Sequence, residues 1–313
     1  MTRGPLTTAA LDAIGAPRLW AIGLAGFLAR GGIVLFALPV VILPSVVGLT
    51  TFIGPNSVTA AGLAPRFVTL IAVTVATVVA AILLGTLVGA TTERALVQAI
   101  ADGRAEDAGQ GERAAGAPPL AGLVAIHIVA LVPLGLAVAI GGARLGQVGY
   151  QELILPSGST APFVVRVLLA APEVVTVLIV AWLVSELIAA VAVRLALLDR
   201  PGTLGALGGT LVWIVHRPVR CLAVMTATTI GSIVLLGPGL VACTLAWSGL
   251  RTALLRPSEP TAALGSVALF VACWIGGLVL AGLAATWRSV AWSLVVLEDH
   301  RGGGPPAIEG GTL

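Results

Sequence analysis

The sequence predicts an all-α membrane protein, a polytopic transmembrane helix bundle with about six spans and short interfacial helices. Only 10% of its 313 residues are charged, whereas soluble domains carry about 25%. The mean hydropathy is +1.07. The apolar runs are mostly 24 to 35 residues long, which suits helical spans of about 20 residues and not the strands of about ten residues in a membrane β-barrel.

Stretches with few or no charges mark the expected spans. They cover residues 31–65, 67–92, 114–143, 172–195, 221–250 and 260–287. Before them, Leu19–Ala29 is too short to cross the hydrocarbon. We therefore expect an interfacial segment that leads into the first span, with Arg30 either inside that span or at the membrane face. Pro39 and Pro44 are expected to kink or end the first helix.

We expect residues 1–300 to form a single membrane domain, in which loops and short helices connect the spans. Residues 101–118 are polar and rich in Gly and Ala, which is typical of a flexible cytoplasmic loop. Residues 203–215 are expected to form an elbow helix along the inner membrane surface, with Leu204, Leu207, Leu211 and Ile214 on one face. The tail 301–313 is expected to be disordered.

The arginines predict the orientation, because cytoplasmic loops carry an excess of positive charge. With a cytoplasmic N-terminus and Arg30 left aside, the inner side collects eleven arginines and the outer side five. The inner set is Arg3, Arg18, Arg94, Arg104, Arg113, Arg194, Arg200, Arg217, Arg220, Arg288 and Arg301, and the outer set is Arg66, Arg144, Arg166, Arg251 and Arg256. We therefore expect both termini to lie in the cytoplasm. The expected location is the cell membrane of a bacterium.

Four ionisable residues lie within the expected spans, and such residues are functional candidates because burial in lipid is costly. They are Arg30, His127, Glu173 and Glu186. Glu186 lies fourteen residues beyond Pro172, roughly 21 Å along a helix, where it could carry a proton or bind a cationic group. The alternative is an ion pair with Arg30 or Arg194, or a place near the inner interface.

His127 and Arg30 each have a functional and a structural interpretation. A buried neutral imidazole at His127 could relay protons, or it could only form a hydrogen bond to a backbone carbonyl. Arg30 precedes Gly31 and Gly32, which would let a backbone or a lipid phosphate approach. Alternatively, its side chain extends to the cytoplasmic headgroups.

Small residues indicate where helices approach closely. Gly85 and Gly89 form a GxxxG pair in the second span, and Gly276 belongs to a group of small residues in the sixth. These positions favour a compact bundle.

The sequence carries no motif of an enzyme or of a cofactor site. It has no phosphate-binding loop, no HExxH and no GxSxG. The three cysteines show no metal-ligand spacing, and the net charge of +3 is too small to indicate nucleic-acid binding. We expect no enzyme activity, no cofactor and no metal.

Two segments carry a resemblance to a known group of proteins. They are AVRLALLDRPGTLGALGGTLVWIVHRPVR (192–220) and WSLVVLEDHR (292–301). Together they resemble bacterial six-helix membrane proteins of uncharacterised function, some of which are similar to the membrane domain attached to glycerophosphodiester phosphodiesterases. The resemblance implies a fold type without an activity, and no phosphodiesterase catalytic domain is expected.

Two classes of function remain open. The first is a structural, accessory or assembly protein of the membrane, with the lipid bilayer and other membrane-protein subunits as its partners. The second is a small transporter or lipid-handling protein that uses Glu186 and Arg30. Convergence of the ionisable residues on one site, or their scatter, would distinguish the two.

Overall fold

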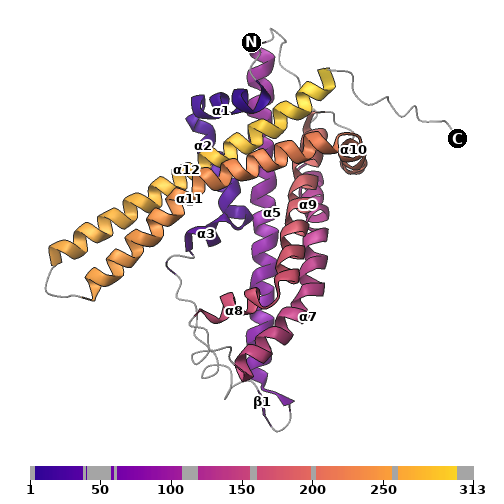
Figure 1. Cartoon of the computed structure of the whole chain (residues 1–313). Helices are drawn as coiled ribbons and strands as arrows, with labels where there is room; N and C mark the ends of the chain where they lie inside the picture. The colour runs from indigo at the N-terminus through magenta and orange to yellow at the C-terminus, as the bar shows by residue number, and fades with distance from the viewer. Residues whose placement is uncertain are drawn as a thin grey trace. The chain divides into compact units, whose positions relative to one another are not determined.

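The computed structural model describes residues 4–37, 40, 58–59, 62–107, 119–155, 161–198, 202–255 and 260–301 (Figure 1). These residues are almost entirely helical, which confirms the predicted all-α class. The helices are α1 (Pro5–Gly15), α2 (Pro17–Phe27), η1 (Leu28–Gly32), α3 (Ile33–Ala37), α5 (Pro65–Asp107), α6 (Leu120–Ala130), α7 (Val132–Ile154), α8 (Phe163–Leu169), α9 (Pro172–Leu198), α10 (Gly202–His216), α11 (Pro218–Leu254) and α12 (Pro260–Arg301). Two short strands, β1 (Val58–Thr59) and β2 (Gly62–Leu63), form an antiparallel pair in which Val58 is opposite Leu63.

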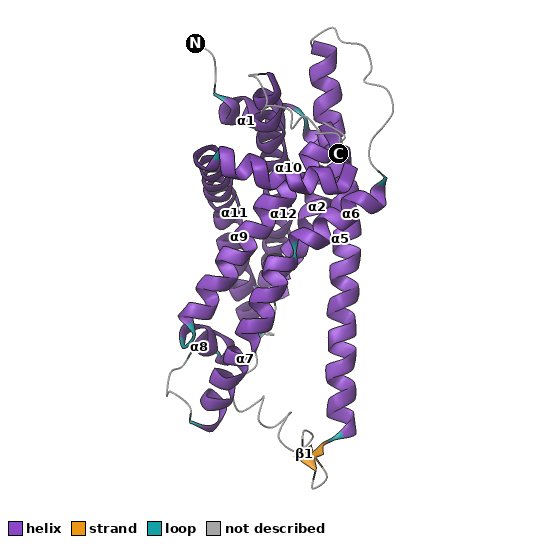
Figure 2. Cartoon of the chain, turned by 90° about the vertical axis from the view of Figure 1, so that its right-hand side faces the viewer, coloured by secondary structure: helices purple, strands orange, loops and turns teal. Residues whose placement is uncertain are grey.

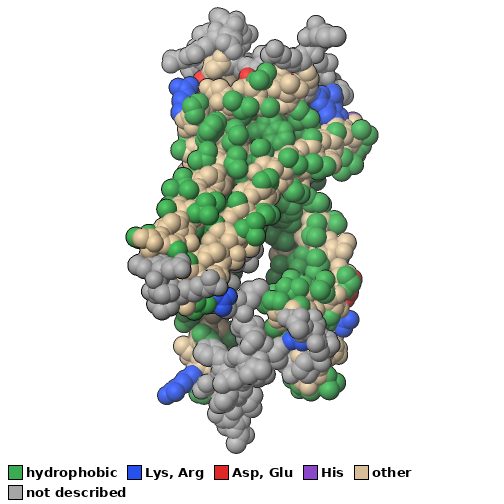
Figure 3. All heavy atoms as spheres, turned by 60° about the vertical axis from the view of Figure 1, so that its left-hand side comes forward, with side chains coloured by type: hydrophobic (Ala, Val, Ile, Leu, Met, Phe, Trp, Pro, Cys, Tyr) green, Lys and Arg blue, Asp and Glu red, His purple; other side chains and the backbone are tan. Residues whose placement is uncertain are grey.

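Six helical stretches among the described residues are long and apolar enough to cross a membrane. They are Pro17–Ala37, Pro65–Gly103, Leu120–Glu152, Pro172–Leu198, Pro218–Leu254 and Thr261–Glu298. On the face drawn in Figure 3, hydrophobic side chains predominate and charged ones are few. The chain is therefore a multi-pass membrane protein.

The first span begins earlier than the sequence indicated. We expected Leu19–Ala29 to be an interfacial segment, but these residues belong to the candidate span Pro17–Ala37, and Arg30 lies inside it. The charge of Arg30 interrupts the apolar run, and for this reason the sequence interpretation placed Leu19–Ala29 outside the first span. The expected kinks at Pro39 and Pro44, like most of 38–57, lie outside the described residues.

The second span continues as a helix well beyond its apolar part. Helix α5 extends to Asp107, so the first seven residues of the expected loop 101–118 are helical, and 108–118 lie outside the described residues. In the third span, Leu131 separates α6 from α7, two residues before Pro133. In the fifth span, Pro238 lies within the continuous helix α11.

The chain divides into two compact units. Unit 1 contains residues 1–40, 85–127 and 187–313, and unit 2 contains residues 41–84 and 128–186. Helices α5, α6 and α9 each contribute residues to both units.

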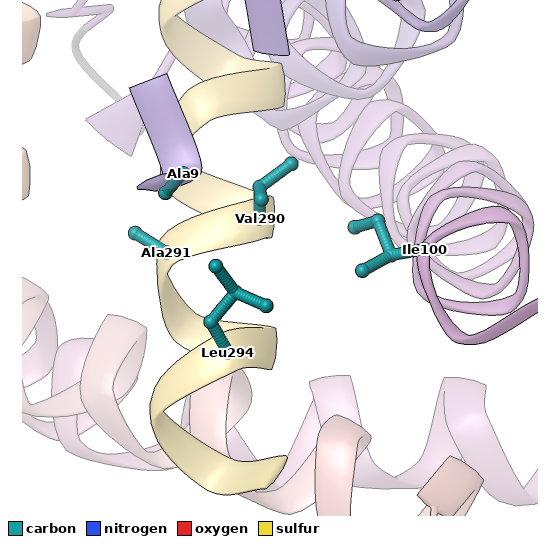
Figure 4. Packing of buried hydrophobic residues seen from close by; sticks show 5 residues of the cluster. All are labelled: Ala9, Ile100, Val290, Ala291 and Leu294. Carbon is teal, nitrogen blue, oxygen red and sulfur yellow. The ribbon is translucent and has the colours of Figure 1, made fainter. Parts of the chain in front are cut away.

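The second half of α12 forms the centre of unit 1. It packs along α11 and against α1 and α2 (Figures 1 and 2), and every residue from Ser289 to Val296 is buried. A hydrophobic cluster joins Val290, Ala291 and Leu294 of α12 to Ala9 of α1 and Ile100 of α5 (Figure 4). Side chains from distant parts of the sequence thus surround one helix.

Unit 2 has its own small core. Val148 of α7 and Val174 of α9 pack with Val167 and Ala171 at the α8 turn. The buried guanidinium of Arg166 on α8 forms an ion pair with Glu152 of α7, with Nη1 and Oε2 3.3 Å apart. The short helix α8 is therefore fixed to α7 by apolar contacts and by one charge pair.

The elbow predicted over 203–215 is helix α10. A separate residue, Arg217, joins it to α11 with a non-helical φ of −133°. The face that packs on the protein contains Ala206, Thr210 and Trp213. Leu204 and Leu211, two residues of the predicted leucine face, are 84% and 61% exposed.

Candidate functional site

A buried carboxylate, Glu93 of α5, holds two arginines in unit 1. Its Oε2 lies 2.5 Å from Nη2 of Arg30, and its Oε1 lies 2.6 Å from Nη2 of Arg194. The hydroxyl of Ser289 donates to the same Oε1 at 3.3 Å. We call these residues, together with His127, the Glu93 cluster. It contains residues of η1, α5, α6, α9 and α12, which are far apart in the sequence.

Arg194 is the most enclosed member of the cluster, since its side chain is 2% exposed. Its Nη1 donates to the carbonyl of Ala190, and its Nη2 also donates to the carbonyl and the hydroxyl oxygens of Ser289 at 3.1 Å and 3.0 Å. Its Nε–H has no hydrogen-bond partner in the described part of the chain. These contacts fix the guanidinium in one orientation toward Glu93.

Arg30 reaches Glu93 from a break in the first span. The helix there passes through a π turn, η1, in which Arg30 has φ −84° and ψ 20° and Gly31 has φ 94°. A positive φ is accessible to glycine at little cost, which explains why glycine follows the arginine. The Arg30 side chain is 31% exposed, so it is less enclosed than Arg194.

The predicted glycine pair of α5 provides the space for this break. A Cβ at Gly89 would lie 3.1 Å from Nε of Arg30, and a Cβ at Gly85 would collide with the carbonyl oxygen of Ala29. Both glycines thus allow η1 to lie directly on α5. Close approach at these two positions was expected, and the partner is the backbone and arginine of the broken helix.

Gly276 differs from the expectation. Nothing lies within 4 Å of the position where its Cβ would be. The close approaches on α12 occur at Gly277, against Phe36, and at Gly282, against the carbonyl of Trp20. The expected packing role at Gly276 is therefore wrong, because α12 turns a different face toward α2 and α3.

His127 of α6 is buried and lies close enough to Glu93 to act on it electrostatically. Two of the four ionisable candidates, Arg30 and His127, thus meet in the same cluster. A protonated imidazole would add a third positive charge beside the carboxylate. Among the described residues, no group of three or more His, Cys, Asp or Glu side chains could hold a metal ion.

The other two candidates belong to unit 2. Glu173, at the start of α9, is exposed and accepts a hydrogen bond from Nε of Arg144 at 3.3 Å. Glu186, later on α9, is half-buried. The expectation that Glu186 pairs with Arg30 or Arg194 stays a prediction, and the structure shows that both arginines bind Glu93.

The sequence interpretation missed Glu93 and Ser289. Glu93 directly follows the apolar run 67–92 and precedes Arg94, so it was counted as the end of a span. A signal was present: Gly85, Gly89 and Glu93 are four residues apart and therefore share one helix face. A carboxylate at the end of a glycine face marks a place where another chain segment can approach it.

The chain matches no protein-family model, and it matches none of the curated proteins and none of the solved structures.

Proposed function

We propose that this protein is a structural, accessory or assembly component of a bacterial membrane, without catalytic activity of its own. The observation that carries this proposal is the Glu93 cluster. Both carboxylate oxygens bind arginines, and Arg194 also binds a backbone carbonyl on its own helix and another on α12. Charges used in this way hold helices together, and buried polar groups are often retained for such specificity.

A rigid unit 1 would suit a scaffold for other membrane-protein subunits. Its helices approach at glycine positions and are fixed at their centre by the Glu93 cluster, and apolar side chains cover much of its exterior. The partners would be the lipid bilayer and neighbouring subunits, and nucleic acid would not be among them.

The orientation we propose places both termini in the cytoplasm, on the basis of the arginine asymmetry. Single cysteines at Gln110 and at Gly158, in a variant without the three native cysteines, should differ in their reaction with an impermeant thiol reagent. In intact cells we expect labelling at Gly158 and little at Gln110. Equal labelling of the two positions would overturn the orientation.

A small transporter or lipid-handling protein is the second candidate, and one observation favours it. The first span is broken at Arg30 and Gly31, inside the membrane segment and beside charged groups. Broken helices of this kind form substrate and ion sites in transporters. In this alternative, transport would depend on Arg30 and on Glu186, which belong to different units.

Glu186→Gln separates the two functions. For a structural protein, this change should lower thermal stability or leave it unchanged, and liposomes should show no pH-driven uptake with either variant. A proton- or cation-coupled transporter should keep its thermal stability and lose uptake. Glu173→Gln is the matched control, because it removes an exposed carboxylate from the same helix. Uptake by the native chain that Glu186→Gln abolishes and Glu173→Gln retains would replace the structural proposal.

A further inference from the structure

Helices α11 and α12 form an antiparallel hairpin in which two glycines meet. Helix α11 ends at Leu254 and α12 begins at Pro260, and the two helices lie side by side (Figures 1 and 2). A Cβ at Gly239 of α11 would lie 3.3 Å from the Cα of Gly277 of α12. The two backbones therefore touch at this level, as helices in a membrane do where small residues allow a close approach.

Two cysteines lie one helical turn from this glycine contact. Cys243 follows Gly239 by four residues, and residues four apart share a helix face. Cys273 precedes Gly277 by the same number. Because the helices are antiparallel, both steps lead in the same direction along the hairpin. The Sγ of Cys243 points toward α12, since it lies 3.8 Å from the position that a Cβ on Gly277 would take.

The next contact along the hairpin agrees with this register. The rings of Trp247 on α11 and Phe270 on α12 have centroids 5.4 Å apart. Cys243 and Cys273 thus lie between the glycine contact and an aromatic contact, and their thiols are close enough to act on each other electrostatically. Both thiols are free, with Cys243 buried and Cys273 half-buried. The hairpin therefore places two thiols opposite each other.

This thiol pair lies deep within two candidate spans. Cys243 is eleven residues before the end of α11, and Cys273 is thirteen residues after the start of α12. These are roughly 17 Å and 20 Å along the helices, and the hydrocarbon of a bilayer is about 30 Å thick. The sequence has no charged residue over 221–250 or over 260–287. Chemistry at the pair therefore takes place where charge is costly.

We propose that Cys243 and Cys273 form a reversible disulfide across the hairpin, with a lipid-soluble quinone as the oxidant. Two S–H bonds break and one S–S bond forms. The two protons and two electrons pass to the quinone oxygens, which gives a quinol. A disulfide requires Cα atoms about 4.4–6.8 Å apart, whereas helix axes usually lie about 8–10 Å apart. The glycine contact next to the pair brings the two chains closer than usual.

The apolar surroundings favour a disulfide over a metal site. Thiolates bind soft ions such as Cu(I), but two thiolates around a monovalent ion leave a net negative charge in the hydrocarbon. The dithiol and the disulfide are both uncharged. A quinone suits the same location, because it dissolves in lipid and accepts both the electrons and the protons. This proposal does not depend on the structural role proposed above.

The test counts thiols in the purified full-length chain. The chain is reduced, incubated in detergent with decylubiquinone, denatured and labelled with maleimide–polyethylene glycol. We expect three labels before the quinone is added and one label afterwards, with one quinol formed per chain. The intact mass should fall by two hydrogens, and a digest should contain the peptides of Cys243 and Cys273 joined. Dithiothreitol should restore three labels. Retention of all three labels after quinone treatment, or the joining of two chains instead, would overturn the proposal.

Cys221 provides the matched control, because it lies near the start of α11, about 33 Å along the helix from Cys243. Cys221→Ser should pass from two labels to none, whereas Cys243→Ser and Cys273→Ser should keep two labels after quinone treatment. Oxidation should also raise the melting temperature of the native chain and of Cys221→Ser, since a cross-link constrains the unfolded chain. A loss of labels in Cys273→Ser as large as in the native chain would show that the oxidation does not join these two cysteines.

Discussion

Replacing Glu93 with glutamine is expected to lower the free energy of unfolding by about 3–5 kcal/mol, the cost of breaking a buried ion pair by removing one partner. The amide keeps one acceptor oxygen, but its NH2 group would face a guanidinium that now has no counter-charge. Both arginines would lose their shared carboxylate. The helices that meet at Glu93 should therefore separate at a lower temperature.

Glu298→Gln is the control for this experiment. It also removes a carboxylate that binds one arginine at 2.8 Å, but Glu298 is 50% exposed and Arg220 is 32% exposed. Exposed ion pairs contribute about 0–1 kcal/mol, so this variant should melt close to the native protein. Thermal unfolding of both variants in the same detergent provides the comparison. Equal melting temperatures for the two would mean that the Glu93 cluster does not hold unit 1 together.

The two arginines should differ in their contributions. Arg194→Met should destabilise more than Arg30→Met, because Arg194 is almost fully enclosed and also binds Ala190 and Ser289. The side chain of Arg30 is 31% exposed, and its Nη2 binds the carboxylate of Glu93. Since both contact the same group, their effects should not be additive when combined with Glu93→Gln.

The spans could be predicted from composition because lipid imposes a simple length and hydropathy rule. The same rule misplaced the first span at Arg30. A charge inside an apolar run looks like a boundary when its partner is 63 residues away, and one sequence does not reveal such a partner. Arg30 is acceptable in a span because Glu93 neutralises it.

The candidate site could be predicted in part. Arg30 and His127 were identified because each lies within an apolar run. Arg194 lies near the end of its run and was assigned to the inner side, and Glu93, which follows the run 67–92, was missed. The glycines of α12 do not show which face of the helix packs, because Gly276, Gly277 and Gly282 would each allow a close approach. That choice depends on the positions of α2 and α3, which are set by contacts across the whole of unit 1.

Gly282→Ala should destabilise the protein by about 1–3 kcal/mol, as overpacking a close contact does. A Cβ at this position would lie 2.5 Å from the carbonyl oxygen of Trp20 and 3.3 Å from Cβ of Leu24. Since the nearer atom belongs to the backbone, no side-chain rotation can relieve the contact, and α2 would have to move. Such a shift would extend toward η1, so we also expect the Arg30–Glu93 pair to weaken.

Gly276→Ala is the matched control, with the same substitution in the same helix. Nothing lies within 4 Å of its Cβ position, and alanine is favoured over glycine in a helix interior by up to about 1 kcal/mol. The two alanine variants should therefore shift the melting temperature in opposite directions, or Gly276→Ala should leave it unchanged while Gly282→Ala lowers it. If Gly276→Ala destabilised the protein and Gly282→Ala did not, α12 would have to present the face predicted from the sequence, and the packing of α2 on Gly282 would be wrong.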